Sequence, residues 1–270
     1  MRIQHNIAAL NTHRNLAANN TSAGKDLEKL SSGYKINRAG DDAAGLSISE
    51  KMRGQIRGLD MATKNAQDSI SLIQTAEGGL NETHSILQRM RELAVQSAND
   101  TNVAADRKAI QAEINELASE ITRIGNNTEF NTQTLLAGTF TTKTFHIGAN
   151  KDQSIKLSIT DMRAATLGVN AVDVKSQTTA NTAIKTVNDA LSKVSTQRSN
   201  LGAVQNRLEH TISNLGATSE NLTAAESRIR DTDMAKSMMD FTKNNILMQA
   251  AQSMLSQANQ QPQGVLQLLG

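Results

Sequence analysis

The sequence predicts a mainly α protein, a long antiparallel helical bundle or coiled coil with a small β-hairpin region at its tip. Apolar residues recur at heptad spacing over two long segments of the chain. A short middle segment instead alternates apolar and polar residues around a turn. The composition agrees, because the 270 residues include one Pro, no Trp and 2% aromatic residues. Long uninterrupted helices with cores of Ala, Leu, Ile and Met are therefore expected.

The first long helix is predicted over about residues 52–94. Counting from Met52 in alternating steps of four and three residues gives thirteen positions over six heptads, and nine of these positions are apolar. Those positions are Met52, Ile56, Leu59, Thr63, Ala66, Ile70, Ile73, Glu77, Leu80, His84, Leu87, Arg91 and Ala94. Ser47 and Glu50 have capping-box spacing and are predicted to mark the start of this helix.

A shorter helix and a hairpin are predicted next. The helix has one apolar register, and Gly125-Asn126-Asn127 is predicted to end it. Its register consists of Ile110, Ile114, Leu117, Ile121 and Ile124. Beyond it, apolar residues alternate on both sides of Gly148-Ala149-Asn150, which predicts a β-hairpin within a small region at about 130–175. The alternating residues are Phe145, Ile147, Ile155, Leu157 and Ile159.

The second long helix is predicted over about residues 184–229. Ten of its fourteen heptad-spaced positions are apolar. They run Ile184, Val187, Leu191, Val194, Arg198, Leu201, Gln205, Leu208, Ile212, Leu215, Ser219, Leu222, Glu226 and Ile229. The two long helices thus form the limbs that the hairpin region joins.

The two ends of the chain, residues 3–30 and 234–258, are amphipathic but carry few apolar residues. Isolated helices of this kind are marginal in water. One interpretation is that the C-terminal tail packs back on its own domain. The other is that both ends stay partly disordered until another subunit supplies the missing surface.

Several function classes are excluded by what the sequence lacks. It has no Cys, so disulfides and thiolate chemistry are ruled out. Its net charge is only +2, and it has no stripe of basic residues of the kind that binds nucleic acid. No apolar run has the length of a signal peptide or a membrane span. None of the common catalytic, phosphate-binding or metal-binding motifs is present. Asp41 and Asp42 are adjacent, and we interpret them as turn or cap residues rather than a catalytic pair. No cofactor and no enzymatic activity are expected.

Three sequence blocks resemble the bacterial flagellin family. They are LSSGYKINRAGDDAAGLSISEKMRGQIRGL at 30–59, QRMRELAVQSA at 88–98 and NLTAAESRIRDTDMAKSMMDFTKNNILMQAAQSMLSQANQQPQGVLQLLG at 221–270. The likeness covers about 1–130 and 175–270, and only the short hairpin region stands where many members carry large outer domains. The resemblance therefore implies a short filament subunit of the bacterial flagellum.

This resemblance carries expectations about organisation and partners. Residues 1–40 and 229–270 would form inner-tube helices, with a connecting spoke in the first, and residues 41–228 the surrounding domain. The family is exported unfolded by a type III apparatus without a cleaved signal and lies outside the cell. Expected partners are other copies of the chain, the flagellar cap and hook-associated proteins, an export chaperone on the C-terminal helix and the innate immune flagellin receptor. Membrane insertion is not expected.

The resemblance also assigns roles to individual residues. Inner-tube packing is expected from Ile3, Ile7, Leu10, Leu27, Leu30, Phe241, Met248 and Leu255. Arg38, Asp41 and Asp42 of the spoke loop are candidates for polar contacts between subunits, with turn chemistry as an equal alternative. Gln88, Arg89, Leu93 and Glu113 match the receptor contacts, although Met90 stands where the family often has Val. The same surface is also a candidate for contact between subunits.

Three alternatives remain at this point. A hook–filament junction protein shares the end helices but caps a joint. A cytosolic coiled-coil signalling protein requires heptads that continue through the tip, and the alternation at 145–159 disagrees with that. An enzyme is the weakest alternative, because family members with a protease carry it in a large central domain.

Overall fold

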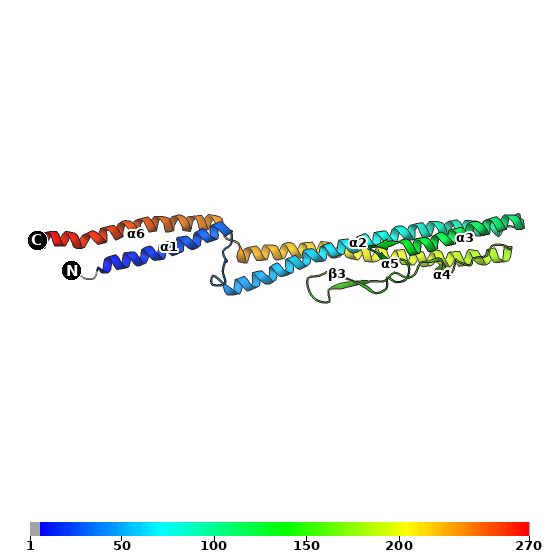
Figure 1. Cartoon of the computed structure of the whole chain (residues 1–270), viewed down its shortest axis with the longest axis horizontal. Helices are drawn as coiled ribbons and strands as arrows, with labels where there is room; N and C mark the ends of the chain where they lie inside the picture. The colour runs from blue at the N-terminus through cyan, green and yellow to red at the C-terminus, as the bar shows by residue number, and fades with distance from the viewer. Residues whose placement is uncertain (1–5, 270) are drawn as a thin grey trace. The chain divides into compact units, whose positions relative to one another are not determined.

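The computed structural model describes the backbone of residues 6–269 and the side chains of residues 6–261. It confirms a mainly α fold with small antiparallel hairpins (Figure 1). The helices are α1 (Ile7–Ser32), α2 (Ala43–Ser97), α3 (Ala104–Asn127), α4 (Ala164–Leu167), α5 (Gln177–Arg230) and α6 (Met234–Leu269). The strands are β1 (Glu129–Phe130), β2 (Gln133–Thr134), β3 (Lys143–His146) and β4 (Ser154–Leu157).

The chain divides into two compact units. The terminal unit comprises the chain up to Gly54 and from Asn221 onward, and the central unit comprises Gln55–Glu220. Within the central unit, α2 runs antiparallel to both α3 and α5. Arg89 of α2 pairs with Glu113 of α3, and Asp60 of α2 accepts a hydrogen bond from Ser219 of α5.

Helix α2 begins earlier than the sequence predicts. Its first residue is Ala43, and the side chain of Asp42 accepts a hydrogen bond from the backbone N–H of Gly45 at 2.9 Å. Asp42 therefore satisfies an N–H at the helix start that has no intrahelical acceptor. Ser47 and Glu50 lie inside the helix, so the capping box predicted there is wrong.

One of the two predicted heptad rows of α2 is confirmed as core. Its residues are 0–8% exposed, and they are Leu59, Ala66, Ile73, Leu80, Leu87 and Ala94. The other predicted row, which includes Ile70 and His84, is only half-buried, and its Arg91 is exposed. A row of smaller residues takes its place in the core, namely Ala62, Ser69, Ala76, Thr83, Met90 and Ser97.

The small residues of this second row allow neighbouring segments to approach α2 closely. Ser69 and Thr83 satisfy their hydroxyl groups within the helix, since they donate to the carbonyl oxygens of Asn65 and Gly79 at 2.7 and 2.9 Å, whereas the hydroxyl of Ser97 donates to the carbonyl oxygen of Val174 at 2.6 Å. Helix α5 repeats the pattern. Val187 and its heptad partners 194, 201, 208 and 215 are buried as predicted, whereas Ala183, Ala190 and Gln197 form a second buried row that apolarity alone does not reveal.

The predicted hairpin is confirmed as β3 and β4, paired in antiparallel register from Lys143 opposite Leu157 to His146 opposite Ser154. It lies against α2. A Cβ at Gly58 would stand 2.9 Å from the Cβ of Ala149, and Asn65 donates its side-chain N–H to the carbonyl oxygen of His146 at 3.1 Å. The glycine at position 58 is thus required for this close approach. The β1–β2 pair and α4 are too short to be predicted from periodicity.

Two buried glutamines hold the irregular segments of the central unit. Gln111 of α3 donates to the carbonyl oxygen of Val172 at 2.8 Å and accepts from the N–H of Val174 at 2.7 Å. Gln197 of α5 accepts from the hydroxyl of Thr160 at 3.1 Å. These side chains replace the backbone pairing that a longer sheet would provide, which explains why polar residues occupy core positions.

We expect Asp161 to make the stability of the central unit depend on pH. The Arg163 guanidinium donates to the Asp161 carboxylate at 2.7 Å and lowers the pKa of Asp161 from 3.8 to about 2. Because the folded pKa lies below the unfolded one, the stabilisation is fully present above about pH 4 and is lost as pH falls towards about 2. Urea titrations across this range should give a flatter pH dependence for Asp161→Asn than for the parent chain. The exposed Asp68→Asn is the control, and equal slopes for the two variants would contradict the prediction.

Candidate functional site

The two ends of the chain form an antiparallel helix pair, α1 with α6 (Figure 1). The side-chain amide of Asn6 donates to the carbonyl oxygen of Ala258 at 2.8 Å, and that of Asn244 donates to the carboxylate of Asp26 at 2.7 Å. These contacts place the start of α1 beside the later part of α6. Segments separated by most of the chain are therefore neighbours.

The contact between these helices is a narrow heptad stripe. On α1 the less exposed positions are Ala9, Thr12, Leu16, Asn19, Ala23, Asp26 and Leu30. On α6 they are Ser237, Phe241, Asn244, Met248, Ala251, Leu255 and Ala258. Among the described residues of the two helices only Ala23 and Ala258 are fully buried, at 7% and 8% exposure. Two helices that bury so little apolar surface have a poor core.

The predicted inner-tube residues divide into two groups. Leu30, Phe241, Met248 and Leu255 lie on the stripe between α1 and α6. Ile7, Leu10 and Leu27 are 56%, 63% and 55% exposed. Ile3 lies outside the described residues. Any apolar partner for the exposed three must come from outside this unit, so their packing in a filament stays a prediction.

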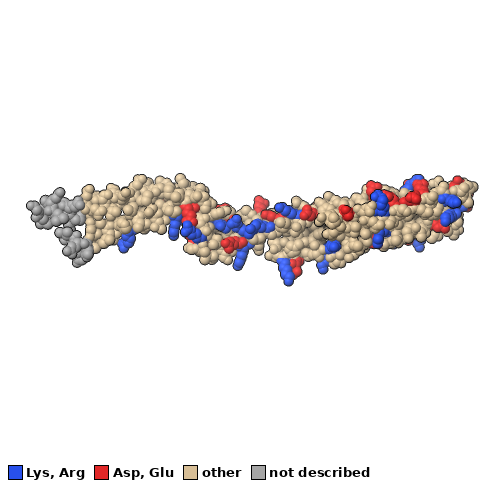
Figure 2. Space-filling model, in the orientation of Figure 1, with Lys and Arg blue, Asp and Glu red and all other residues tan. Residues whose placement is uncertain are grey.

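Helix α6 also has exposed apolar residues, which lie off the stripe except for Met234, seven residues before Phe241. They are between 41% and 67% exposed, and they are Met234, Met238, Met239, Ile246, Leu247 and Met254. The chain has no charged residue from 244 onward, and Arg14 is the only Lys, Arg, Asp or Glu in residues 7–24. Figure 2 shows the matching absence of blue and red over most of this helix pair. Apart from Arg14 and the charged residues at 25–29 and 236–243, the helix pair is thus an uncharged surface rich in exposed apolar side chains, which is typical of an interaction surface.

A short backbone junction joins the end of α1 to the end of α5. Gly33, with φ of 74°, ends α1, and Tyr34 forms an antiparallel bridge with Asp231. The N–H of Lys35 donates to the carbonyl oxygen of Arg230 at 2.7 Å, and the Arg230 guanidinium lies 4.7 Å from the centre of the Tyr34 ring. The left-handed conformation at position 33 favours glycine.

Turn chemistry accounts for both aspartates of the predicted spoke loop. The N–H groups of Asn37 and Arg38 donate to the Asp41 carboxylate at 3.2 and 3.0 Å, which lowers the pKa of Asp41. Asp42 caps α2, as described above. The Arg38 guanidinium donates to Glu28 at 2.9 Å while remaining 75% exposed. Contacts between subunits through Arg38, Asp41 and Asp42 stay a prediction.

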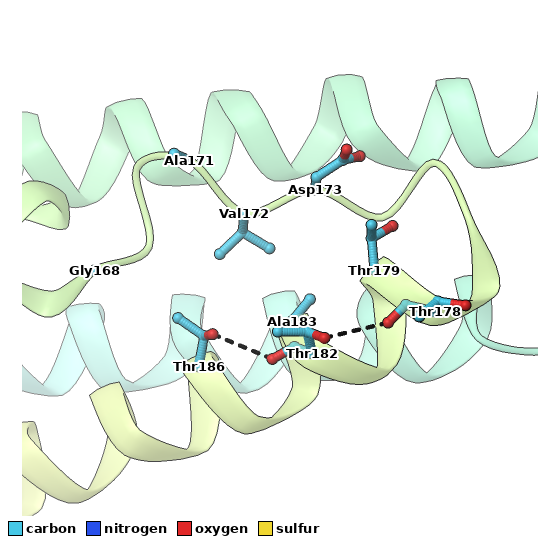
Figure 3. Close-up of a pocket in the computed structure, with 9 residues that line it drawn as sticks. All are labelled: Gly168, Ala171, Val172, Asp173, Thr178, Thr179, Thr182, Ala183 and Thr186. Atoms are coloured by element: carbon cyan, nitrogen blue, oxygen red, sulfur yellow. Dashed lines mark hydrogen bonds between the residues drawn. The ribbon is translucent and has the colours of Figure 1, made fainter.

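A cavity of about 270 Å³ in the central unit has no catalytic arrangement (Figure 3). Asp173 is the one ionisable residue that lines it, and its carboxylate accepts a hydrogen bond from the N–H of Lys175 at 2.9 Å. The hydroxyls of Thr182 and Thr186 donate to helix carbonyl oxygens at 3.3 and 3.1 Å. Over the described part of the chain there is also no group of three or more potential metal ligands, and no helix is long and apolar enough to cross a bilayer.

Comparison with known proteins identifies the family. The profile of the bacterial flagellin N-terminal helical region matches residues 3–141, and that of the C-terminal helical region matches residues 184–269. The flagellin of Halalkalibacterium halodurans is 60% identical over 271 residues, and that of Bacillus subtilis (strain 168) is 58% identical over 303 residues. Both alignments cover 100% of this chain and 100% of the relative. The chain belongs to the bacterial flagellin family.

The flagellin fold extends to a solved structure. The crystal structure of Bacillus cereus flagellin matches with a TM-score of 0.52 and 30% identity, and covers 60% of this chain and 94% of that one. As a short flagellin without a large outer domain, the chain is a structural subunit of the flagellar filament and not an enzyme. The uncharged helix pair lies within the two helical regions that define the family.

The predicted receptor-contact residues of this flagellin have different environments. The Arg89 guanidinium donates to Glu113 of α3 at 3.0 Å and to Glu92 at 3.2 Å, which raises the pKa of Arg89. Gln88 is exposed on the same helix. Leu93, however, is 2% exposed and belongs to the core. Its side chain supports this surface from beneath and is not available for direct contact.

Proposed function

We propose that α1 and α6 complete their packing only when neighbouring subunits cover them, forming the inner tube of the filament. The exposed apolar side chains of this helix pair carry the proposal. Water-exposed Ile7, Leu10 and Ile246 favour burial, and a second copy of the chain can cover them with different exposed apolar side chains of its own helix pair. A repeated contact that does not close on itself produces a filament. In this assembly residues 1–40 and 229–270 form the tube and residues 41–228 surround it.

The same surface supports export in an unfolded state through the flagellar type III apparatus to the outside of the cell. A terminal unit with so few buried residues opposes unfolding weakly, and no disulfide restrains the chain. Before assembly, the exposed side of α6 is a suitable binding surface for an export chaperone. In the finished filament the cap and hook-associated proteins contact the same helical ends.

Seeded growth tests this proposal and separates it from a hook–filament junction protein. Purified subunits are added to sheared filament fragments and followed by electron microscopy, with limited proteolysis of α1 and α6 before and after growth. We expect long filaments and strong protection of both helices in the polymer. Growth that stops after one layer of subunits would favour the junction protein. Filaments in which both helices stay as protease-sensitive as in the monomer would contradict the proposed tube.

We also propose that the free subunit is recognised by the innate immune flagellin receptor through Gln88, Arg89 and Glu113. Arg89→Ala removes an exposed guanidinium held by two carboxylates, and we expect about a tenfold loss of potency in a receptor reporter assay. Arg123→Ala is the matched control, because Arg123 pairs with Glu120 elsewhere on α3. Undiminished signalling by Arg89→Ala would contradict the assignment. Leu93→Ala is unsuitable as a test because it would open a cavity in the core.

A further inference from the structure

We propose that the exposed methionines of α6, Met234, Met238, Met239 and Met254, are an oxidation site that controls assembly. Peroxide converts them to sulfoxides in the free subunit, and the oxidised subunit no longer joins the filament. Packing into the filament protects them. The inference rests on the proposed function in one respect, namely that neighbouring subunits cover α6.

The methionines of the chain differ sharply in exposure. Four of the five methionines in α6, namely Met234, Met238, Met239 and Met254, are 49%, 51%, 67% and 61% exposed, while Met248 is half-buried on the stripe. In contrast, Met90 and Met162 of the central unit are 0% and 4% exposed. Because oxidation of a thioether depends on contact with the dissolved oxidant, the α6 methionines should react before the buried pair. Met61 of α2 is 56% exposed and provides an internal control outside the terminal unit.

Two of the methionines lie within apolar ridges of α6. Met239 and Ile246 are seven residues apart, as are Leu247 and Met254, so each pair stacks along the helix two turns apart. All four side chains are exposed, while Phe241, Met248 and Leu255 face the stripe with α1. Each ridge thus combines one oxidisable and one inert side chain on a surface that α1 does not cover.

The chemistry requires only a peroxide. The methionine sulfur attacks one peroxide oxygen, a sulfur–oxygen bond forms and the oxygen–oxygen bond breaks. Sulfur loses two electrons, and hydrogen peroxide is reduced to water. The product is polar and accepts hydrogen bonds. From residue 244 onward the side-chain donors of α6 are those of Asn, Gln and Ser alone, so burial of a sulfoxide at Met254 between subunits is costly. Lys236 and Lys243 are the charged donors of α6, and they lie in the segment that holds the other three methionines.

Peroxide treatment of the free subunit and of finished filaments tests the proposal. Mass spectrometry of peptides measures the added oxygen at each methionine, and a seeded pelleting assay measures growth. We expect α6 methionines to oxidise in the free subunit well before Met90 and Met162 and to be protected in the filament. Growth of the oxidised subunit should fall about tenfold or more, and methionine sulfoxide reductase should restore it.

A variant with the four exposed α6 methionines replaced by Leu, and Met248 retained, should grow after peroxide treatment at the same rate as before it. The control Met61→Leu should lose growth as the parent chain does. Normal growth of the oxidised parent chain, or equal inhibition of the four-Leu variant, would overturn the proposal. Equal oxidation of the exposed α6 methionines in the free subunit and in the filament would contradict the claim that packing into the filament protects them. Failure of the untreated subunit to grow on seeds would instead count against the proposed function.

Discussion

Replacing Leu255 by Asp is expected to abolish pelletable filaments while the central unit unfolds as in the parent chain. Leu255 lies half-buried on the α1–α6 stripe, in a stretch with no charged residue from 244 onward. The basic residues of α6, Lys236 and Lys243, lie at least twelve positions before Leu255, so a carboxylate placed there meets no basic partner on this helix, and its desolvation opposes both helix pairing and contact between subunits. Seeded ultracentrifugation measures filament formation, and circular dichroism follows unfolding of the central unit.

Leu255→Met is the matched control, because it keeps the volume and apolar character of the side chain. Filaments should form from this variant at nearly the usual yield. Normal pelleting of Leu255→Asp would show that the stripe does not contribute to assembly. A lowered melting temperature of the central unit in Leu255→Asp would contradict the separation of roles between the two units.

Leu80→Ala is expected to destabilise the central unit by about 2–5 kcal/mol. Leu80 is 0% exposed and lies in the confirmed heptad row of α2, within the core shared by α2, α3, α5 and the hairpin segments. Removal of the side chain leaves a cavity that rigid helices fill poorly. Urea denaturation monitored by circular dichroism measures the loss of unfolding free energy.

Met61→Ala provides the comparison for Leu80→Ala. Met61 is on the same helix but 56% exposed, so its truncation should change the unfolding free energy by no more than about 0.5 kcal/mol. Equal effects of the two substitutions would mean that the heptad row does not form the core. A cost below about 1 kcal/mol for Leu80→Ala would lead to the same conclusion.

Heptad periodicity predicted the long helices and one buried row of each, because large apolar residues such as Leu87 and Leu208 indicate a core position directly. It did not predict the second rows. Ala76, Ser69 and Thr83 are buried because their small size lets other segments approach, and apolarity does not report this property. Heptad spacing of small residues, in register with the large ones, is the signal that would have revealed them.

The candidate site was predictable in kind but not in detail. The scarcity of apolar residues at both chain ends predicted helices that need a further partner, and the exposure of Leu10 and Leu27 in the single chain fits that expectation. The junction between Tyr34 and Asp231 depends on backbone pairing, which leaves no mark in side-chain patterns. The burial of Leu93 depends on its position relative to α3 and α5, which no single helix specifies.

The pairing of α1 with α6 has a kinetic consequence. The hydrogen bond from Asn6 to Ala258 joins residues 252 positions apart, so almost the whole chain lies within the loop that it closes. Contacts at such a separation form late in folding, because closing so long a loop costs conformational entropy before the contact contributes any stabilisation. A growing chain that has not yet reached α6 cannot make the pair. Helix α1 therefore exists without its partner for the whole period in which the intervening residues are synthesised.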